Sequence, residues 1–211
     1  DFESFTISDE AMSAFLGDVE KKPFDSLVVT ITGKQGSGKT RFAFQFINAL
    51  AQNYKVAHAS MEEHPQSRLY MEKVQQYFND TTLANTEAHD VRTLEELDTL
   101  IKRNDVIVID SFQKMKDLHK PFEVDRDLRK KYNGKLFLVI YQQTVTGQMR
   151  GGSKSQFDGD IILFTESFPD YKENYVYPDK NRYNREVGLK YSIYNQNLLT
   201  EPEETNVIEV Y

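Results

Sequence analysis

Short apolar runs rich in β-branched residues alternate with segments of helical periodicity along the first two thirds of the chain. The runs predict strands at residues 27–32, 55–60, 106–109 and 135–141. Because such runs offer apolar side chains on both faces, both faces of the resulting sheet are expected to be covered. Strands of this kind that alternate with helices are typical of a parallel sheet flanked by helices.

The segments between the predicted strands place apolar residues three and four positions apart, as helices do. Helices are predicted at residues 41–52, 66–78, 93–103 and 122–132. In the second of them, Leu69, Val74 and Tyr77 are expected to pack against the core. The third begins with Thr93 and Glu96 at the spacing of a capping box.

The C-terminal third has a different pattern, in which turns rather than helices separate the strand candidates. These candidates lie at residues 160–164, 174–177 and 189–194 and are expected to extend the sheet in antiparallel fashion. The prediction is therefore an α/β fold, a mainly parallel sheet flanked by helices with antiparallel C-terminal strands. Its domain plan is a lead-in at 1–26, one core domain at 27–200 and an acidic tail at 201–211.

The turn after the first predicted strand reads GKQGSGKT and matches the phosphate-loop pattern G-x-x-x-x-G-K-[ST] in full. It has the required context, with an apolar strand before it and a helix after it. Glycines let successive backbone N–H groups surround a phosphate, and the helix adds the positive end of its dipole. The predicted ATP-binding residues of this loop are Gly33, Lys34, Gln35, Gly36, Ser37, Gly38, Lys39 and Thr40.

Two of these residues have chemical roles beyond the loop backbone. Lys39 is expected to reach the β- and γ-phosphates, and Thr40 to offer a hydroxyl to Mg²⁺. Asp110 ends the strand at 106–109 and is the second predicted metal residue. An aspartate at a strand end can also simply cap a turn, but the phosphate loop upstream favours the metal role. The cofactors predicted are therefore ATP and Mg²⁺.

Four stretches together resemble RecA-like P-loop ATPases, in particular the branch of RadA, DnaB-type helicases and KaiC. They are GKQGSGKT at 33–40, SMEEH at 60–64, VIVIDSFQ at 106–113 and VIYQQ at 139–143. The segment 146–164 looks like the stretch that runs from the second DNA-binding loop of this family to the next strand. The resemblance covers most of residues 27–183 and is one of pattern rather than of close identity.

The resemblance implies catalytic roles for three further residues. Glu62 and Glu63 follow the second strand, where these ATPases keep the carboxylate that orients and activates water, and we favour Glu62. The alternative is that both acids simply begin the next helix, where its dipole favours them. Gln142 occupies the place of the glutamine that senses the γ-phosphate.

Three basic residues have weaker assignments. The sequence DKNRY at 179–183 resembles the KNRF motif of RadA, which implies that Lys180 and Arg182 act on the nucleotide of a neighbouring subunit in a homo-oligomer. The alternative is a basic turn between two strands. Arg68 could stack on adenine as a flat cation, or it could be a solvated helix residue.

The segment 144–157 contains three glycines together with Arg150 and Lys154, next to the predicted sensor. A basic loop in this place suits ATP-gated binding of single-stranded DNA, and Lys114, Lys116 and Lys120 could form a second basic loop. The alternative is that both are solvated loops. The net charge of −7 favours the alternative, whereas the family resemblance favours DNA.

Composition narrows the remaining classes of function. The chain lacks cysteine, which excludes disulfides and thiolate metal sites, and no apolar run approaches the roughly 20 residues that cross a bilayer. A cytoplasmic location without membrane contact fits. The sequence therefore predicts an oligomeric ATPase acting on single-stranded DNA in recombination or replication. The alternative is a KaiC-like regulatory or assembly ATPase with a protein partner, and the paired glutamates and Gln142 disfavour a small-molecule kinase.

Overall fold

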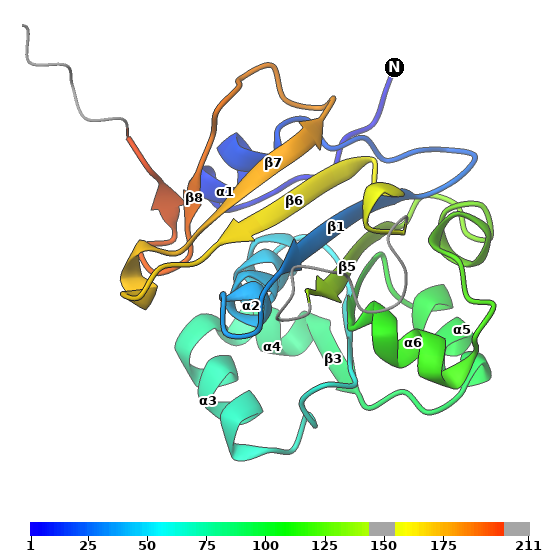
Figure 1. Cartoon of the computed structure of the whole chain (residues 1–211). Coiled ribbons are helices and arrows are strands. Elements are labelled where there is room, and N and C mark those ends of the chain that lie inside the picture. Colours follow the sequence, from blue (N-terminus) through cyan, green and yellow to red (C-terminus); the bar gives the residue numbers. More distant parts are fainter. Residues whose placement is uncertain (144–154, 201–211) are drawn as a thin grey trace, which may run out of the picture.

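The computed structural model describes residues 1–143 and 155–200, which form a single sheet with helices packed against it (Figure 1). The strands are β1 (Leu27–Gly33), β2 (Val56–Ser60), β3 (Thr86–His89), β4 (Val106–Asp110), β5 (Leu136–Gln142), β6 (Ile161–Glu166), β7 (Tyr175–Asn181), β8 (Tyr191–Ser192) and β9 (Asn197–Leu198). Their order in the sheet is β3-β2-β4-β5-β1-β6-β7-β8-β9.

The first six strands in this order run parallel, and β7, β8 and β9 are added antiparallel after β6. The predicted fold class is therefore confirmed. All residues of β1, β2 and β4 are buried, which explains why their sequences are apolar at successive positions.

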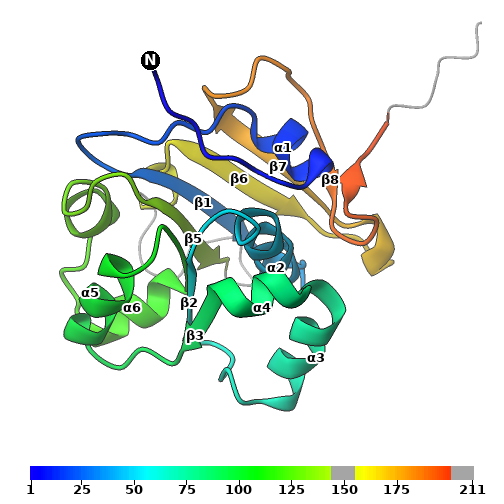
Figure 2. The same ribbon diagram turned by 180° about the vertical axis from the view of Figure 1, so that it is seen from behind.

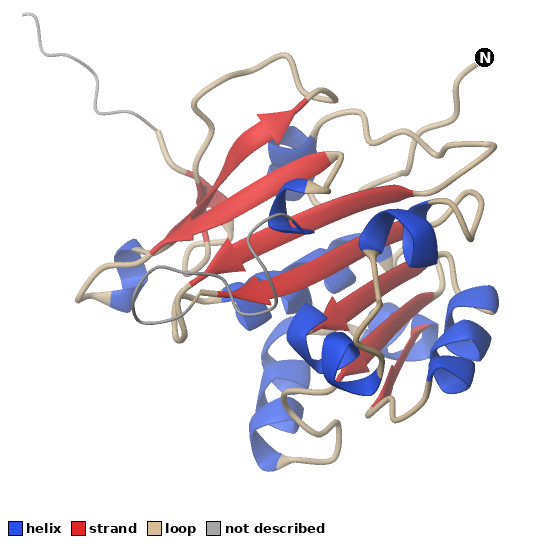
Figure 3. Ribbon diagram, turned by 45° about the vertical axis from the view of Figure 1, so that its right-hand side comes forward, coloured by secondary structure: helices blue, strands red, loops and turns tan. Residues whose placement is uncertain are grey.

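Helices cover both faces of the sheet (Figures 2 and 3). They are α1 (Glu10–Leu16), α2 (Lys39–Leu50), α3 (Arg68–Tyr77), α4 (Asp80–Asn85), α5 (Leu94–Lys102) and α6 (Phe112–Leu118), with short helical turns at Asp125–Arg129, Ser155–Phe157 and Tyr171–Glu173. None of the helices within residues 1–143 and 155–200 is long and apolar enough to span a bilayer.

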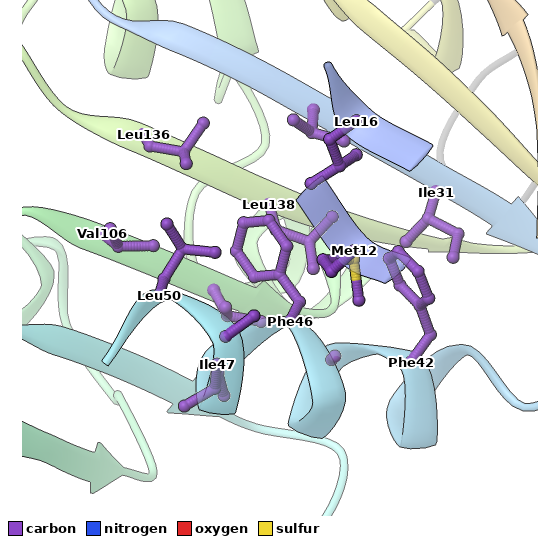
Figure 4. Packing of buried hydrophobic residues seen from close by; sticks show 14 of the residues in the cluster. Met12, Leu16, Ile31, Phe42, Phe46, Ile47, Leu50, Val106, Leu136 and Leu138 are labelled. Atoms are coloured by element: carbon purple, nitrogen blue, oxygen red, sulfur yellow. The ribbon is translucent and has the colours of Figure 1, made fainter. Parts of the chain in front are cut away.

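Two apolar cores lie on opposite sides of the sheet. In the first, α1 and α2 pack on one face, where Phe42, Phe46 and Leu50 of α2 meet Leu136 and Leu138 of β5 (Figure 4). In the second, α5 and α6 pack on the other face against the alternate residues of the same strands. Because the central strands contribute to both cores, their burial ties the two helical layers together.

Some local predictions were wrong. The segment 122–132 forms only the turn Asp125–Arg129, whose ends are joined by an ion pair between those two residues, rather than a full helix. Lys114 and Lys116 lie in α6 and not in a basic loop, because Phe112 and Met115 anchor that segment to the core.

The packing of α3 also differs from the prediction. Leu69 is 63% exposed, and Tyr70 is buried in its place together with Val74 one turn later. Tyr70 and Val74 join Phe44 of α2 in a small third core. His58 of β2 lies against this core, with its Nδ1 2.8 Å from the hydroxyl of Tyr70.

His58 is fully buried, and its Nε2 has no hydrogen-bond partner among the described residues. Burial lowers the pKa of its imidazole to about 3, because the charged form would lose its hydration. The folded protein therefore keeps this histidine neutral over a pH range in which the unfolded chain, with a pKa near 6.5, takes up a proton.

We predict that His58 makes the free energy of unfolding fall as the pH decreases below about 6.5. Between pH 7 and pH 5, the free energy of unfolding of the wild type should fall by about 2 kcal/mol more than that of the His58→Gln variant. The reason is that only the wild-type unfolded state gains this proton. Urea denaturation of both proteins at several pH values measures the difference. A difference that stays constant over this range would contradict the prediction.

Candidate active site

The carboxyl ends of four neighbouring parallel strands meet at one edge of the sheet. The register pairs Gly33 of β1 with Gln142 of β5, and Ser60 of β2 with Asp110 of β4. A cavity of about 350 Å³ lies at this edge. Its lining residues are Gln35, Gly36, Gly38, Lys39, Thr40, Arg41, Glu62, Glu63, Lys73, Asp110, Ser111, Ile140 and Gln142. The structure thus brings together residues from all four motifs of the sequence.

The loop between β1 and α2 has the backbone that its glycines permit. Gly36 and Gly38 have φ angles of 74° and 99°, in the left-handed region that disfavours other residues. A Cβ atom on Gly38 would also lie 2.7 Å from the Cδ1 atom of Ile193. Ser37 is held from outside the loop, because its hydroxyl accepts a hydrogen bond from Thr165 on β6 at 2.8 Å.

Lys39 begins α2 and turns its side chain back into the loop. Its Nζ donates to the carbonyl oxygens of Gly33 and Lys34 at 2.8 and 2.7 Å. Burial lowers the pKa of this ammonium to about 8, while the carboxylates of Asp110 and Glu62 act in the opposite direction. Lys39 is therefore a cation held inside the concave side of the loop, where an anion would neutralise it.

Thr40 and Asp110 form the second feature of the cavity. The Thr40 hydroxyl donates to Oδ2 of Asp110 at 3.1 Å. Burial raises the pKa of the Asp110 carboxyl to about 6, and within the described residues no basic side chain forms an ion pair with it. A buried carboxylate beside a hydroxyl supplies the hard oxygen ligands that Mg²⁺ prefers, so the residues present fit this ion.

The two glutamates at the end of β2 have different partners. Glu62 accepts a hydrogen bond from the Ser111 hydroxyl at 2.6 Å. Glu63 instead forms an ion pair with Lys73 of α3, with its two oxygens at 3.2 and 2.9 Å from Nζ. Neither Ser111 nor Lys73 was predicted as a site residue from the sequence. The only local signal was that Ser111 follows Asp110 directly, and nothing in the sequence links Lys73 to Glu63.

The remaining predicted residues lie as follows. Gln142 lines the cavity. Arg68 begins α3, and its largely exposed side chain forms an ion pair with Glu72. Arg68 lines neither this cavity nor a second cavity on the other side of Gly36 and Gly38. Lys180 lies within β7, opposite Ile162, and Arg182 follows the strand, so neither lines the cavity of its own chain. Arg150 and Lys154 lie outside the described residues.

A family model described as AAA domain matches residues 22–144. The chain belongs to the AAA domain family. The matched part of this AAA domain contains the phosphate loop, both glutamates, Asp110 and Gln142. Membership associates the chain with nucleotide binding and hydrolysis in general terms. No curated protein sequence matches it significantly.

Solved structures with the same fold belong to RecA-like P-loop proteins. The flagellar accessory protein FlaH from Methanocaldococcus jannaschii aligns with a TM-score of 0.66 at 12% identity, over 95% of this chain and all 100% of that one. A KaiC-like protein from Pyrococcus horikoshii OT3 gives a TM-score of 0.61 at 19% identity, over 96% and 99% of the two chains.

The RadB recombinase aligns with a TM-score of 0.54 at 16% identity, over 88% of this AAA domain chain and 94% of its own. At these identities the likeness establishes the fold and nothing finer. Together with the family match, it confirms the resemblance to RecA-like P-loop ATPases that the sequence motifs indicated.

Proposed function

We propose that this AAA domain is a magnesium-dependent ATPase whose nucleotide lies in the cavity at the carboxyl edge of the sheet. The observation that carries the proposal is the meeting of Lys39, Thr40, Asp110 and Glu62 at one cavity, although these residues come from three separate segments of the chain. An ammonium, a pair of oxygen ligands and a carboxylate that can orient water are the groups that suit phosphoryl transfer to water.

Each residue has a distinct part in this proposal. Lys39 exchanges its bonds to the carbonyls of Gly33 and Lys34 for phosphate oxygens, because those carbonyls are weaker partners than an anion. Thr40 and Asp110 would hold Mg²⁺, which would neutralise charge on the phosphates. Glu62 orients the attacking water, and Gln142 lies beside the phosphate loop at the end of β5.

A second cavity supports a place for the base and ribose. It has a volume of about 380 Å³ and shares Gly36, Gly38 and Arg41 with the first cavity. Tyr77, Tyr171 and Tyr194 line it, and the hydroxyl of Tyr77 accepts a hydrogen bond from Arg41 at 3.1 Å. Aromatic rings next to a phosphate site suit a nucleobase, so these tyrosines take the role for which Arg68 was considered.

The proposal extends to a homo-oligomer and to single-stranded DNA. Because Lys180 and Arg182 do not line the cavity of their own chain, they could act only on the nucleotide of a neighbouring copy. Gln142 precedes the segment that carries Arg150 and Lys154, and this order along the chain supports DNA binding coupled to the nucleotide. The second candidate, a regulatory ATPase with a protein partner, is favoured by the net charge of −7.

The first prediction from this proposal concerns Lys39. The Lys39→Ala variant should bind ATP with magnesium at least about tenfold more weakly than the wild type, because a buried cation facing the phosphates is lost. Lys34→Ala is the matched control, since the Lys34 side chain is exposed and only its carbonyl faces inward. Titration calorimetry measures the ATP affinity of both variants. In a separate experiment on the wild type, chelation of magnesium by EDTA should abolish hydrolysis. Equal losses in the two variants would contradict the role of Lys39.

The second prediction concerns the base. Tyr77→Ala and Tyr194→Ala should each weaken ATP binding by about 1 kcal/mol, or roughly fivefold, since each loses one aromatic contact. Their affinity for inorganic tripolyphosphate should not change, because it has no base. Arg68→Ala serves as the control and should bind ATP as the wild type does. A variant that loses affinity equally for ATP and tripolyphosphate would argue against a base site here.

The third prediction separates the two candidate partners. At fixed low salt, single-stranded DNA should raise the steady-state rate of ATP hydrolysis several-fold, and Arg150→Ala combined with Lys154→Ala should remove the increase. The same double variant should keep the rate measured without DNA. An ATPase rate that DNA leaves unchanged would reject the DNA partner and support the regulatory ATPase.

A further inference from the structure

Ser111 occupies a helix N-cap but does not cap its helix. It precedes α6 and is 2% exposed, yet its side chain makes no hydrogen bond to the first turn. Side chains do cap α1, α3, α4 and α5, through Asp9, Ser67, Asn79 and Thr93, whereas α2 follows a glycine, which has no side chain to cap with. A serine at an N-cap normally stabilises its helix by accepting such a bond. At Ser111 the hydroxyl instead donates to Glu62, 49 residues earlier in the chain.

The backbone around Glu62 is held by hydrogen bonds to Asp110, the residue that precedes Ser111. The N–H groups of Met61 and Glu62 donate to the carbonyl oxygen of Asp110 at 2.9 and 3.2 Å. The Ser60 hydroxyl donates to the carbonyl of Glu63, which fixes the turn that the two glutamates form. The end of β4 therefore positions both the main chain and the carboxylate of Glu62. Fixing a flexible side chain before the reaction lowers the entropy lost when water is aligned.

Glu63 lies next in the chain but is differently engaged. Both of its oxygens contact the ammonium of Lys73, and both side chains are largely buried. A carboxylate whose two oxygens both contact a cation has fewer acceptor positions left to hold water than one that accepts a single hydroxyl bond. The two adjacent glutamates are thus made unequal by their partners, one at the end of β4 and the other in α3.

We propose that Ser111 is a positioning residue that holds Glu62 in place as the water-activating carboxylate, while Lys73 keeps Glu63 out of the reaction. This inference rests on the proposed ATPase function. It explains why the hydroxyl of Ser111 is directed to the cavity at the expense of the α6 cap.

The test is a double-mutant cycle on the full chain, read as kcat for ATP hydrolysis. Ser111→Ala should lower kcat about tenfold and leave the dissociation constant for ATP unchanged, whereas Ser111→Thr, which keeps a hydroxyl, should recover most of the loss. In the Glu62→Gln background, Ser111→Ala should cause no further loss, because the carboxylate on which it acts has gone. The kcat of Glu63→Gln should remain at least tenfold higher than the kcat of Glu62→Gln.

Ser67→Ala is the matched control, because the hydroxyl of Ser67 does cap its helix by accepting from the N–H of Tyr70. It should lower Tm by about 2–4 °C and leave kcat unchanged, the reverse of Ser111→Ala. Losses from Ser111→Ala and Glu62→Gln that multiply in the double variant would overturn the inference while leaving the ATPase proposal intact. A wild-type chain that neither binds nor hydrolyses ATP would overturn the proposed function and this inference with it.

Discussion

The parallel hydrogen-bond register of β1, β2, β4 and β5 is the constraint on which the rest of this structure depends. Because the strands point the same way, their carboxyl ends, and the loops that leave them, lie at one edge of the sheet. The burial of these strands on both faces holds that register rigidly, since a shift by one residue would exchange the side chains that face the two apolar cores. The packing of the two cores therefore fixes where the strand ends that carry the site lie.

Burial shifts the pKa values of two charged groups in the cavity that results. Lys39 is bound to two carbonyl oxygens, and burial lowers its pKa, while burial raises the pKa of Asp110 nearby. A polyanion with a divalent cation would match both groups, because each would then face opposite charge in a region of low dielectric constant. The two helices that directly follow the phosphate loop and Asp110 also lack a side-chain cap: neither Gly38 before α2 nor Ser111 before α6 makes such a hydrogen bond.

Much of the fold could be predicted from the sequence, because strong periodicity and complete burial leave few alternatives. The predictions that failed concern segments whose conformation or buried face depends on tertiary contacts. The segment 122–132 has helical spacing but forms only a short turn. Lys114 and Lys116, two of the three lysines considered for a second basic loop, lie in a helix because Phe112 and Met115 reach the core. Leu69 and Tyr70 could each have faced inward from α3, and the position of Phe44 and His58 selected Tyr70.

The same division applies to the site. The sequence by itself determined the phosphate loop, since glycines, a lysine and a hydroxyl at fixed spacing can form that loop from local backbone geometry alone. Only the tertiary structure decided how the two glutamates differ. Glu62 and Glu63 are adjacent residues of the same type, so the sequence does not distinguish them. Their partners, Ser111 and Lys73, come from other parts of the chain, and their approach depends on how α6 and α3 pack. Packing acts through distances in space, which the order of residues along the chain does not contain.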